Sequence, residues 1–421
     1  IKLSEDKGKL EIKKSAIVGL IQSQVSQTNL LNDSKVKVKM YKRKIKGSAM
    51  PLAIMFSAMA ALFLAAVMSH WQETTMLYAR NDAVRQADAA IYASCLICCR
   101  DMSILPEGTG PVSIQPFPEK NIEVLVYRRM HGLYDMLTFK VRLHGGGERC
   151  SARLIGKSAD MTGSSVMIKD TGRDISIGDE CLIESTLYVP KGRYRPVSHA
   201  GSGRHRLSGN LDIRKSPAAF PFTDARADEA LKMIYEDSCG DNVFLSDMDS
   251  IPDMIVSARS VTVGSKFRNS VQIFARDSIV LEDGAFLEYP SGIHVMSPGG
   301  MIVMKGNSVV EGYAIVSSTG GNQDYGTGQI NYIQTDSATV RGLVIVDGKA
   351  DIRGTVTGSL YLSYPISRTG RGYSPMTLRG LIQIDKCSLP YPVFLSGAAG
   401  MEVAKVLPPE FQTSHNKETM Q

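Results

Sequence analysis

The residues with the clearest capacity for binding chemistry form a basic run between Lys191 and Arg206. Seven basic residues and one tyrosine occur there with no acidic residue among them: Lys191, Arg193, Tyr194, Arg195, His199, Arg204, His205 and Arg206. Such a run can attract a polyanion, for example an acidic glycan or anionic lipid headgroups. A solvated loop has the same composition. The sequence leaves both readings open, the first being a polyanion contact formed by Lys191, Arg193, Arg195, Arg204 and Arg206.

Three cysteines, Cys95, Cys98 and Cys99, occupy one turn of a predicted helix, where they could form a metal or redox site. A structural zinc site needs four ligands, and no histidine or further cysteine lies nearby in the sequence. Cysteine also packs as a small hydrophobic residue, which is the interpretation we favour. The odd total of seven cysteines does not indicate a disulfide framework, although one or two bridges stay open if the body is exported. We therefore expect no metal and no cofactor.

Catalysis on a polysaccharide would need clustered carboxylates, or a basic residue beside a metal-binding acid. The aspartates of the C-terminal half are scattered, mostly at turns, where Asp serves the backbone. The G-x-S-x-G and H-E-x-x-H patterns are absent, and the histidines have no ligand spacing. The sequence predicts a non-enzymatic protein, and the alternative is an envelope protein that binds or cleaves polysaccharide.

The net charge of +6 is concentrated at the N-terminal end. Residues 1–46 contain 12 Lys/Arg and 4 Asp/Glu, whereas the remaining residues contain 36 Lys/Arg and 38 Asp/Glu. The basicity therefore belongs to a leader and not to the body, so we expect no nucleic-acid partner.

Residues 48–69 form a run of 22 residues without a charge. At the rise of an α-helix this run spans about 30 Å, the thickness of the hydrocarbon core of a membrane. Seven Lys/Arg precede it between Lys35 and Lys46 with no acidic residue, whereas charges of both signs follow it. The positive-inside rule then predicts a cytoplasmic N-terminus and an external body. A cleaved secretory signal is the alternative, although the end of the run has only a poor cleavage site.

The start of the chain has two parts. Residues 1–39 are polar and lysine-rich and begin with Ile, whereas Met40 opens a compact membrane signal. We expect Met40 to be the initiator, with residues 1–39 either not translated or an unstructured cytoplasmic tail.

The basic segment Lys42–Gly47 (KRKIKG), followed by Ser48 and the apolar run, resembles the entry of type IV prepilins and minor pseudopilins. In that family a prepilin peptidase cuts after the glycine, so the resemblance implies a cut between Gly47 and Ser48. Major pilins carry Glu at the fifth mature position, where this chain has Leu52. The resemblance therefore implies a minor subunit rather than a major one.

The segment beyond the apolar run is predicted to be helical, and one interpretation is a single long helix. Leu77, Val84, Ile91 and Cys98 recur every seven residues, and neither Gly nor Pro occurs between Pro51 and Pro106. One helix over residues 51–99 would be about 75 Å long. The other interpretation, which we favour, is a membrane anchor followed by a separate, short amphipathic helix.

The rest of the chain reads as β structure. Residues 105–173 predict a small antiparallel β module, and residues 174–407 predict a parallel β-solenoid, with a β-sandwich as the alternative. Val263, Val280 and Val303 mark strands that recur along this part of the chain. The runs DSIVLEDGAFLEY and GMIVMKGNSVVEG resemble coils of bactofilin-type, polymer-forming solenoids. A helix over 223–235, a polar loop over 317–329 and a flexible tail over 408–421 complete the prediction.

The predicted order is thus a cytoplasmic leader (1–47), a transmembrane helix (48–69), a helical stem (70–104) and the β parts. We expect a single-pass, signal-anchored protein of the inner (cytoplasmic) membrane with a periplasmic body. Its expected role is structural or assembly-related in the cell envelope, in its most specific form as a minor pseudopilin-like component of a pilus or secretion apparatus. The expected partners are the lipid bilayer and proteins that contact the membrane helix and stem, further copies of this chain included.

Overall fold

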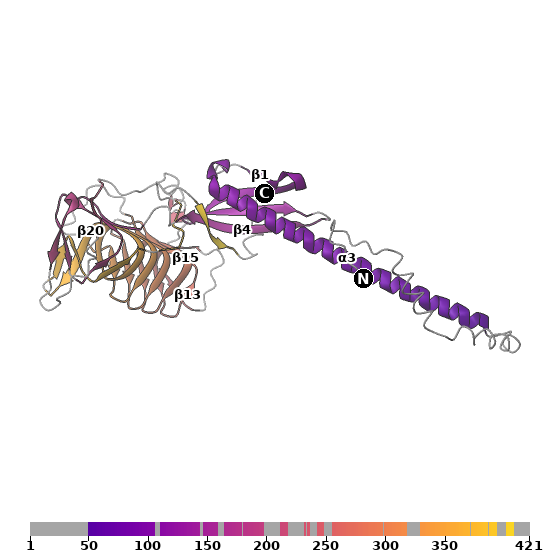
Figure 1. Ribbon diagram of the computed structural model, residues 1–421. Coiled ribbons are helices and arrows are strands. Elements are labelled where there is room, and N and C mark those ends of the chain that lie inside the picture. Colours follow the sequence, from indigo (N-terminus) through magenta and orange to yellow (C-terminus); the bar gives the residue numbers. More distant parts are fainter. Residues whose placement is uncertain are drawn as a thin grey trace, which may run out of the picture. The chain divides into compact units, whose positions relative to one another are not determined.

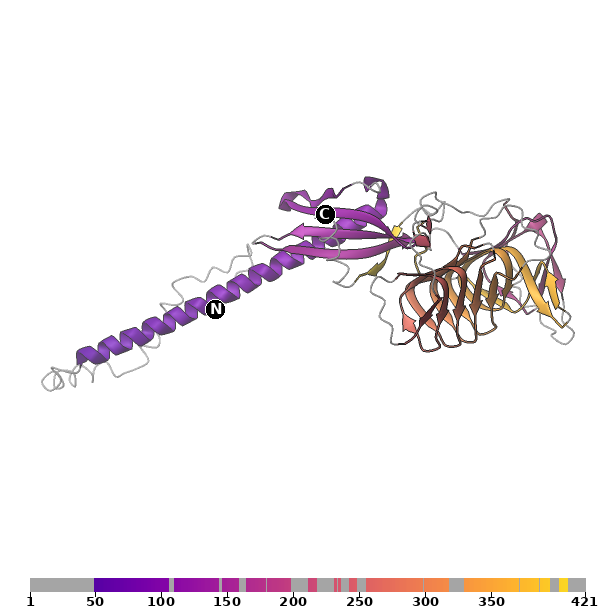
Figure 2. The ribbon, with the colours of Figure 1, turned by 180° about the vertical axis from the view of Figure 1, so that it is seen from behind.

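The computed structural model describes most of the chain from residue 49 onward (Figures 1 and 2). The described part is mainly β with one long apolar helix, which confirms this level of the predicted fold class. The chain divides into two compact units, with the boundary between Asp82 and Ala83. The described residues are 49–105, 110–143, 146–158, 164–178, 180–197, 211–217, 231–232, 234–235, 242–247, 255–297, 299–317, 329–370, 372–385, 387–393 and 401–407.

The helix α3 (Ala49–Arg100, indigo in Figure 1) is a single element of 52 residues. Pro51 lies in its first turn, where a missing backbone N–H breaks no helical hydrogen bond. The absence of later Gly and Pro lets the helix continue, so the favoured interpretation of an anchor followed by a separate short helix is wrong. By length and composition α3 is able to cross a membrane. Beyond it the Asp101 carboxylate accepts a hydrogen bond from the Ser103 N–H and caps the short 3-10 helix η1 (Met102–Ile104).

Five antiparallel strands form a sheet against the last third of α3, with the 3-10 helix η2 (Pro118–Lys120) between the first two. Buried apolar side chains of both elements, such as Ile91 of α3 and Phe139 of the sheet, form one hydrophobic cluster. The C-terminal strand β24 lies within the range 174–407 assigned to the body, yet it pairs with β4. The order is β1 (Val112–Phe117), β2 (Ile122–His131), β3 (Tyr134–Arg142), β4 (Glu148–Lys157) and β24 (Met401–Val406).

The body is a sheet of sixteen described strands whose pairings are parallel except for the hairpin of β20 and β21. This parallel pairing rules out the β-sandwich alternative, since such sandwiches are antiparallel. Its strands are β5 (Ser165–Ile168), β7 (Leu182–Ile183), β8 (Thr186–Val189), β10 (Ile213–Lys215), β11 (Asn242–Leu245), β12 (Ile255–Val263), β13 (Arg268–Asn269), β14 (Gln272–Leu281), β15 (Phe286–Val295), β16 (Met301–Met304), β17 (Val309–Val316), β18 (Tyr332–Gln334), β19 (Thr339–Ile352), β20 (Gly354–Thr369), β21 (Gly372–Pro375) and β23 (Leu381–Ile384).

Six of the described strands close into a ring of parallel pairings, in the order β14, β15, β17, β19, β18, β16 and back to β14. Rows of in-register side chains fill the interior. In one row each of the residues Val263, Leu281, Met304, Gln334 and Ile352 pairs with the next, and all five are buried. The body therefore has one continuous apolar core made by segments that follow one another along the chain.

The register differs by one residue from the repeat read in the sequence. Val280 pairs with Val303, as expected if these two valines mark the same position in neighbouring strands. Val263 pairs with Leu281 and not with Val280, because both Val263 and Leu281 point into the core whereas Val280 is half-buried. Side chains alternate between the two faces of a strand, so a slip of one residue exchanges the faces. Leu281, and not Val280, is therefore the residue equivalent to Val263.

Three glycines lie side by side in neighbouring strands of the core. Gly312, Gly342 and Gly358 pair with one another in neighbouring strands and have φ values of 138°, 137° and 123°. These values lie in a region that L side chains rarely adopt. A Cβ atom at Gly342 would overlap the carbonyl oxygen of Gly312, so the close approach of the two strands requires glycine there.

A second, small parallel sheet consists of β22 (Thr377–Leu378), β6 (Ile175–Gly178) and β9 (Tyr194–Val197). The 3-10 turn η3 (Pro190–Gly192) connects β8 to β9. The basic leader with Gly47 and Ser48, the tail over 408–421 and most of the loop over 317–329 lie outside the described residues. Of the predicted helix over 223–235, the described residues 231–232 and 234–235 are helical.

Candidate functional site

The first part of α3 is apolar on every side. Leu62, Phe63 and Leu64 are consecutive, so their side chains point in directions about 100° apart around the helix axis. All three are exposed, with 72%, 70% and 61% of their surface accessible. A helix with apolar residues on every side is not stable in contact with water and needs a cover of lipid or other protein. This segment is therefore the candidate anchor.

The last third of α3 has two distinct faces. Ala87, Ala90, Ile91, Cys95 and Cys98 are buried against the antiparallel sheet. The opposite face carries an apolar stripe at helical spacing, formed by Ala89, Tyr92, Ala93, Leu96 and Ile97, in which Tyr92 and Leu96 are 56% and 51% exposed. An ion pair joins the helix to the sheet beside this stripe, with 2.9 Å between Arg149 Nε and Asp88 Oδ1.

A buried ion pair fixes the point where the chain leaves α3. Arg128 of β2 donates to the Asp135 carboxylate of β3 from Nη2 at 2.7 Å and from Nε at 3.2 Å. The Arg128 Nη1 group also donates to the Leu105 carbonyl oxygen at 2.9 Å. Only 8% of the Arg128 side chain and 1% of the Asp135 side chain are exposed. The pair therefore attaches the segment after the helix to the sheet.

The cysteines of the predicted helix pack in the same interface. Cys95 and Cys98 are fully buried and Cys99 is 9% exposed, all within the hydrophobic cluster of the helix and sheet. Among the described residues, no group of three or more His, Cys, Asp or Glu side chains could hold a metal ion. The packing interpretation of these cysteines thus agrees with their positions.

The basic residues predicted to contact a polyanion are partly brought together. Lys191 lies in η3, Arg193 follows it and Arg195 lies in β9, whereas Arg204 and Arg206 lie outside the described residues. Lys191 Nζ and Asp174 Oδ1 are 2.9 Å apart. The hydrogen bond from Lys191, followed by the charges of Lys191, Arg193 and Arg195, lowers the pKa of Asp174. Asp174 precedes β6, so the basic run itself contains no sign of it.

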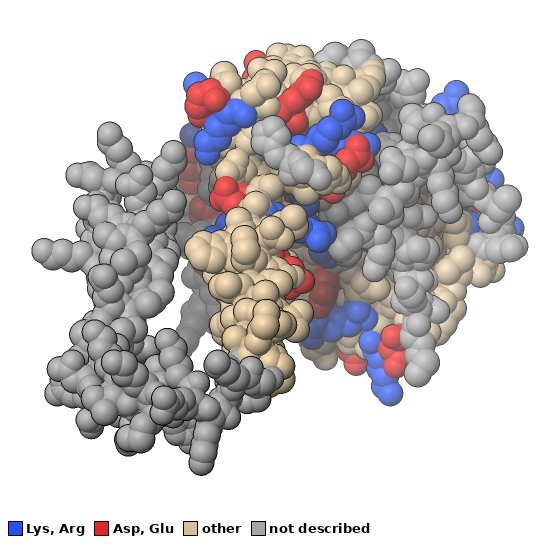
Figure 3. All heavy atoms as spheres, turned by 90° about the vertical axis from the view of Figure 1, so that its right-hand side faces the viewer, with Lys and Arg blue, Asp and Glu red and all other residues tan. Residues whose placement is uncertain are grey.

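This grouping of like charges contrasts with other parts of the surface. On the face drawn in Figure 3, basic and acidic side chains lie interspersed among uncharged surface. Three exposed arginines of the body are each paired with one carboxylate: Arg259 with Asp277 at 2.7 Å, Arg268 with Glu288 at 2.6 Å and Arg341 with Glu311 at 2.6 Å. The cluster formed by Lys191, Arg193, Arg195 and Asp174, called the basic cluster below, has three cations for one carboxylate.

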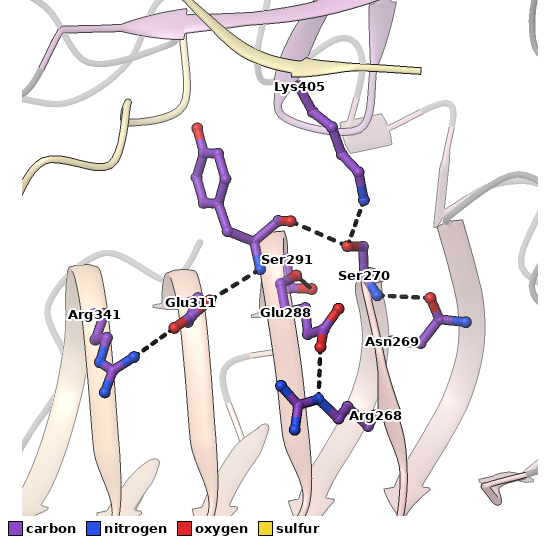
Figure 4. Close-up of polar contacts among 9 residues, drawn as sticks. Arg268, Asn269, Ser270, Glu288, Ser291, Glu311, Arg341 and Lys405 are labelled. Atoms are coloured by element: carbon purple, nitrogen blue, oxygen red, sulfur yellow. Dashed lines mark hydrogen bonds and ion pairs between the residues drawn. The ribbon is translucent and has the colours of Figure 1, made fainter. Parts of the chain in front are cut away.

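A polar junction joins β24 to the body (Figure 4). Lys405 Nζ donates to the Ser270 hydroxyl at 2.7 Å, and that hydroxyl donates to the Tyr289 carbonyl oxygen at 3.0 Å. Burial lowers the pKa of Lys405, and the charge of Glu288 opposes this effect. The Lys405 and Ser270 side chains thereby link β24 to the strands of the body.

Gln272 forms a second, fully buried link between the antiparallel sheet and the body. Its side-chain oxygen accepts from the Leu133 N–H and from the Tyr313 hydroxyl, both at 2.9 Å. Its side-chain nitrogen donates to the His131 carbonyl oxygen at 3.0 Å. The turn between β2 and β3 is thereby held on the outer face of β14.

A buried histidine lies elsewhere on the body. The His294 Nδ1 atom is 2.7 Å from the Tyr235 hydroxyl, and its Nε2 atom is 3.0 Å from the Ser317 hydroxyl. Burial lowers the pKa of His294 to about 3, so the imidazole is neutral at physiological pH.

Comparison with protein-family models, with curated proteins and with solved structures finds no match for this chain. The functional conclusion therefore rests on the chain's own residues and geometry.

Proposed function

We propose that this chain is a single-pass, membrane-anchored structural or assembly protein of the cell envelope, with its β body outside the cytoplasm. The observation that carries the proposal is the change of environment along α3. Its first part exposes apolar side chains on every side, whereas its last third is built into a folded sheet. The basic residues before the helix favour a cytoplasmic N-terminus and hence an inner-membrane location.

In its most specific form, the proposal is a minor pseudopilin-like subunit of a pilus or secretion apparatus. The glycine and serine at positions 47 and 48, before the apolar run, support processing at that bond. A long helix packed on an antiparallel sheet supports the same assignment, since an apolar helix freed from its leader can pass from the bilayer into a protein assembly. The exposed stripe with Tyr92 and Leu96 offers a further surface for helices of neighbouring subunits.

We further infer that the body is a parallel β-solenoid. Support comes from the in-register pairing of segments that follow one another along the chain, such as Val263 with Leu281 and Met304 with Gln334. A solenoid buries its apolar face by stacking successive coils, which suits a rigid structural module.

The anchor is tested by extraction and labelling of native membranes. The protein is expected to stay in the membrane pellet at alkaline pH and to leave it in nonionic detergent. A cysteine introduced at the exposed Tyr373 is expected to react with a membrane-impermeant maleimide in cells whose outer barrier is opened. Release at alkaline pH, or labelling only after lysis of the inner membrane, would contradict the anchor and its orientation.

Assembly is tested separately with a photo-crosslinking amino acid at Leu62, which is 72% exposed. Crosslinked species that contain two or more protein chains are expected in intact cells. The same amino acid at Tyr373, on the body, serves as the matched control. A Leu62 variant that crosslinks only to lipid would leave an anchor without assembly and would contradict the pseudopilin-like form.

A further inference from the structure

The basic cluster offers a binding function separate from the anchor. We propose that Lys191, Arg193 and Arg195 bind an extended anionic glycan that carries carboxylate or sulfate groups along its chain. This inference goes beyond the proposed function and does not depend on how the N-terminus is processed. It uses only described side chains of the second compact unit.

The cations are arranged along one extended segment. Arg193, directly before β9, has extended backbone angles (φ −151°, ψ 152°), and Arg195 of β9 pairs with Ser176 of β6. Residues two apart in a strand lie on the same face, about 7 Å from each other. Tyr194, between them, packs against the hydrophobic core. The two guanidinium groups therefore face solvent in a row, which matches charges repeated along an extended polymer.

Lys191 reaches the same row through an unfavourable backbone conformation. Its φ of 59° and ψ of 7° lie in the left-handed region, where glycine or asparagine would be less strained. The neighbouring Gly192 has a φ of 66°, so the turn contains two successive left-handed residues. Backbone conformations of this kind are enriched at functional positions. Here the strained turn places the Lys191 ammonium group beside Asp174.

Asp174 leaves the cluster with an excess of positive charge. Its carboxylate stays ionised because its pKa is lowered, and it offsets one of the three cations. Both Lys191 and Asp174 are exposed, with 44% and 64% of their side chains accessible, so a ligand can compete for the lysine. Arginine is well suited to this exchange because its planar group binds carboxylate or sulfate in two places.

The geometry favours a glycan over two other partners. A membrane surface is a plane of anions, and the exposed Asp174 carboxylate among the cations would be repelled by that plane. A polymer chain can follow the row of cations and bypass the carboxylate. An added β-strand is disfavoured because Pro196 of the edge strand β9 has no N–H to donate.

The test uses the full chain in micelles of an uncharged detergent, with polygalacturonate as the probe and its methyl ester as the uncharged control. We expect salt-sensitive binding of the acidic polymer and none of the ester. The variant Lys191→Gln/Arg193→Gln/Arg195→Gln is expected to bind about tenfold more weakly or worse. The slope of log affinity against log salt concentration is expected to become shallower by about one per cation removed. The variant Arg259→Gln/Arg268→Gln/Arg341→Gln changes the net charge equally and is expected to bind within about twofold of the native chain.

A single substitution separates binding from folding. Lys191→Asn removes the cation and suits the left-handed backbone, so it is expected to weaken binding while the melting temperature stays or rises. The proposal is overturned if the two triple variants lose affinity equally. It is also overturned if the Lys191→Gln/Arg193→Gln/Arg195→Gln variant loses as much affinity for double-stranded DNA, or for vesicles with anionic lipid, as it loses for the acidic glycan, since net charge alone would then explain the binding.

Discussion

Removing the carboxylate of Asp135 is the sharpest test of how the helix is joined to its sheet. Two hydrogen bonds, at 2.7 Å and 3.2 Å, join Arg128 to Asp135, and both side chains are almost completely buried. Asp135→Asn would leave the guanidinium buried without this counter-charge. Breaking a buried ion pair in this way costs about 3–5 kcal/mol. Because Arg128 also holds the Leu105 carbonyl group, the loss is expected to loosen the exit of α3 from the sheet.

Hydrogen exchange read by mass spectrometry measures this effect locally, without assuming that the whole chain unfolds in one step. A loss of about 3 kcal/mol corresponds to exchange roughly 100-fold faster in β2 and β3. Glu148→Gln is the matched control, since the pair of Lys140 and Glu148 on the same sheet is 29% and 40% exposed. That change should cost less than about 1 kcal/mol. Equal effects of the two substitutions would refute the reasoning.

Replacing both partners of the buried pair gives a further check. Arg128→Met/Asp135→Leu removes both charges and fills a similar volume with apolar atoms. Its stability is expected to lie within about 1–2 kcal/mol of the native chain, because no uncompensated charge is left behind. A double variant as unstable as Asp135→Asn would contradict the explanation that an uncompensated buried charge causes the loss.

Three other substitutions test the body. The pKa of His294 is lowered to about 3, against about 6.5 when unfolded, so its contribution to stability is complete above pH 6.5 and is lost as the pH falls toward 3. Between pH 6 and pH 4 the free energy of unfolding, measured with urea, should fall by about 2 kcal/mol more for the native chain than for His294→Gln. An equal fall in the two proteins would contradict this expectation. Gly342→Ala should destabilise the core by at least about 3 kcal/mol, because the new Cβ meets the Gly312 carbonyl oxygen; a melting temperature equal to that of the native chain would contradict the observed turn. Gln272→Leu should cost about 2–4 kcal/mol and speed hydrogen exchange at Leu133, whereas unchanged exchange there would argue against the link.

The features that the sequence predicted well are local ones. The apolar run and the lack of Gly and Pro after Pro51 indicated a helix throughout this segment, although its continuity as one element was not the favoured interpretation. The strand marked by Val303 is β16. In both cases the signal lies within the segment itself, in its hydrophobic pattern and its boundaries.

The features that the sequence did not predict depend on distant pairing. β24, near the C-terminal end, pairs with β4 of the N-terminal half, and nothing in the run Met401–Val406 identifies that partner. The basic run predicted Lys191, Arg193 and Arg195 as a group, but it could not show that Asp174 lies among them. The one-residue error at Val263 has a similar origin, since the register is set by which face meets the common core.

The measurement that tests the central claim most directly is the N-terminal sequence and mass of the mature protein extracted from membranes. The proposed cut after Gly47 predicts a mature chain that starts at Ser48. Such a chain keeps α3 as its anchor and assembly element. A mature chain that keeps the leader, with its start at Met40 or earlier, would contradict the pseudopilin-like assignment and leave a signal-anchored β protein.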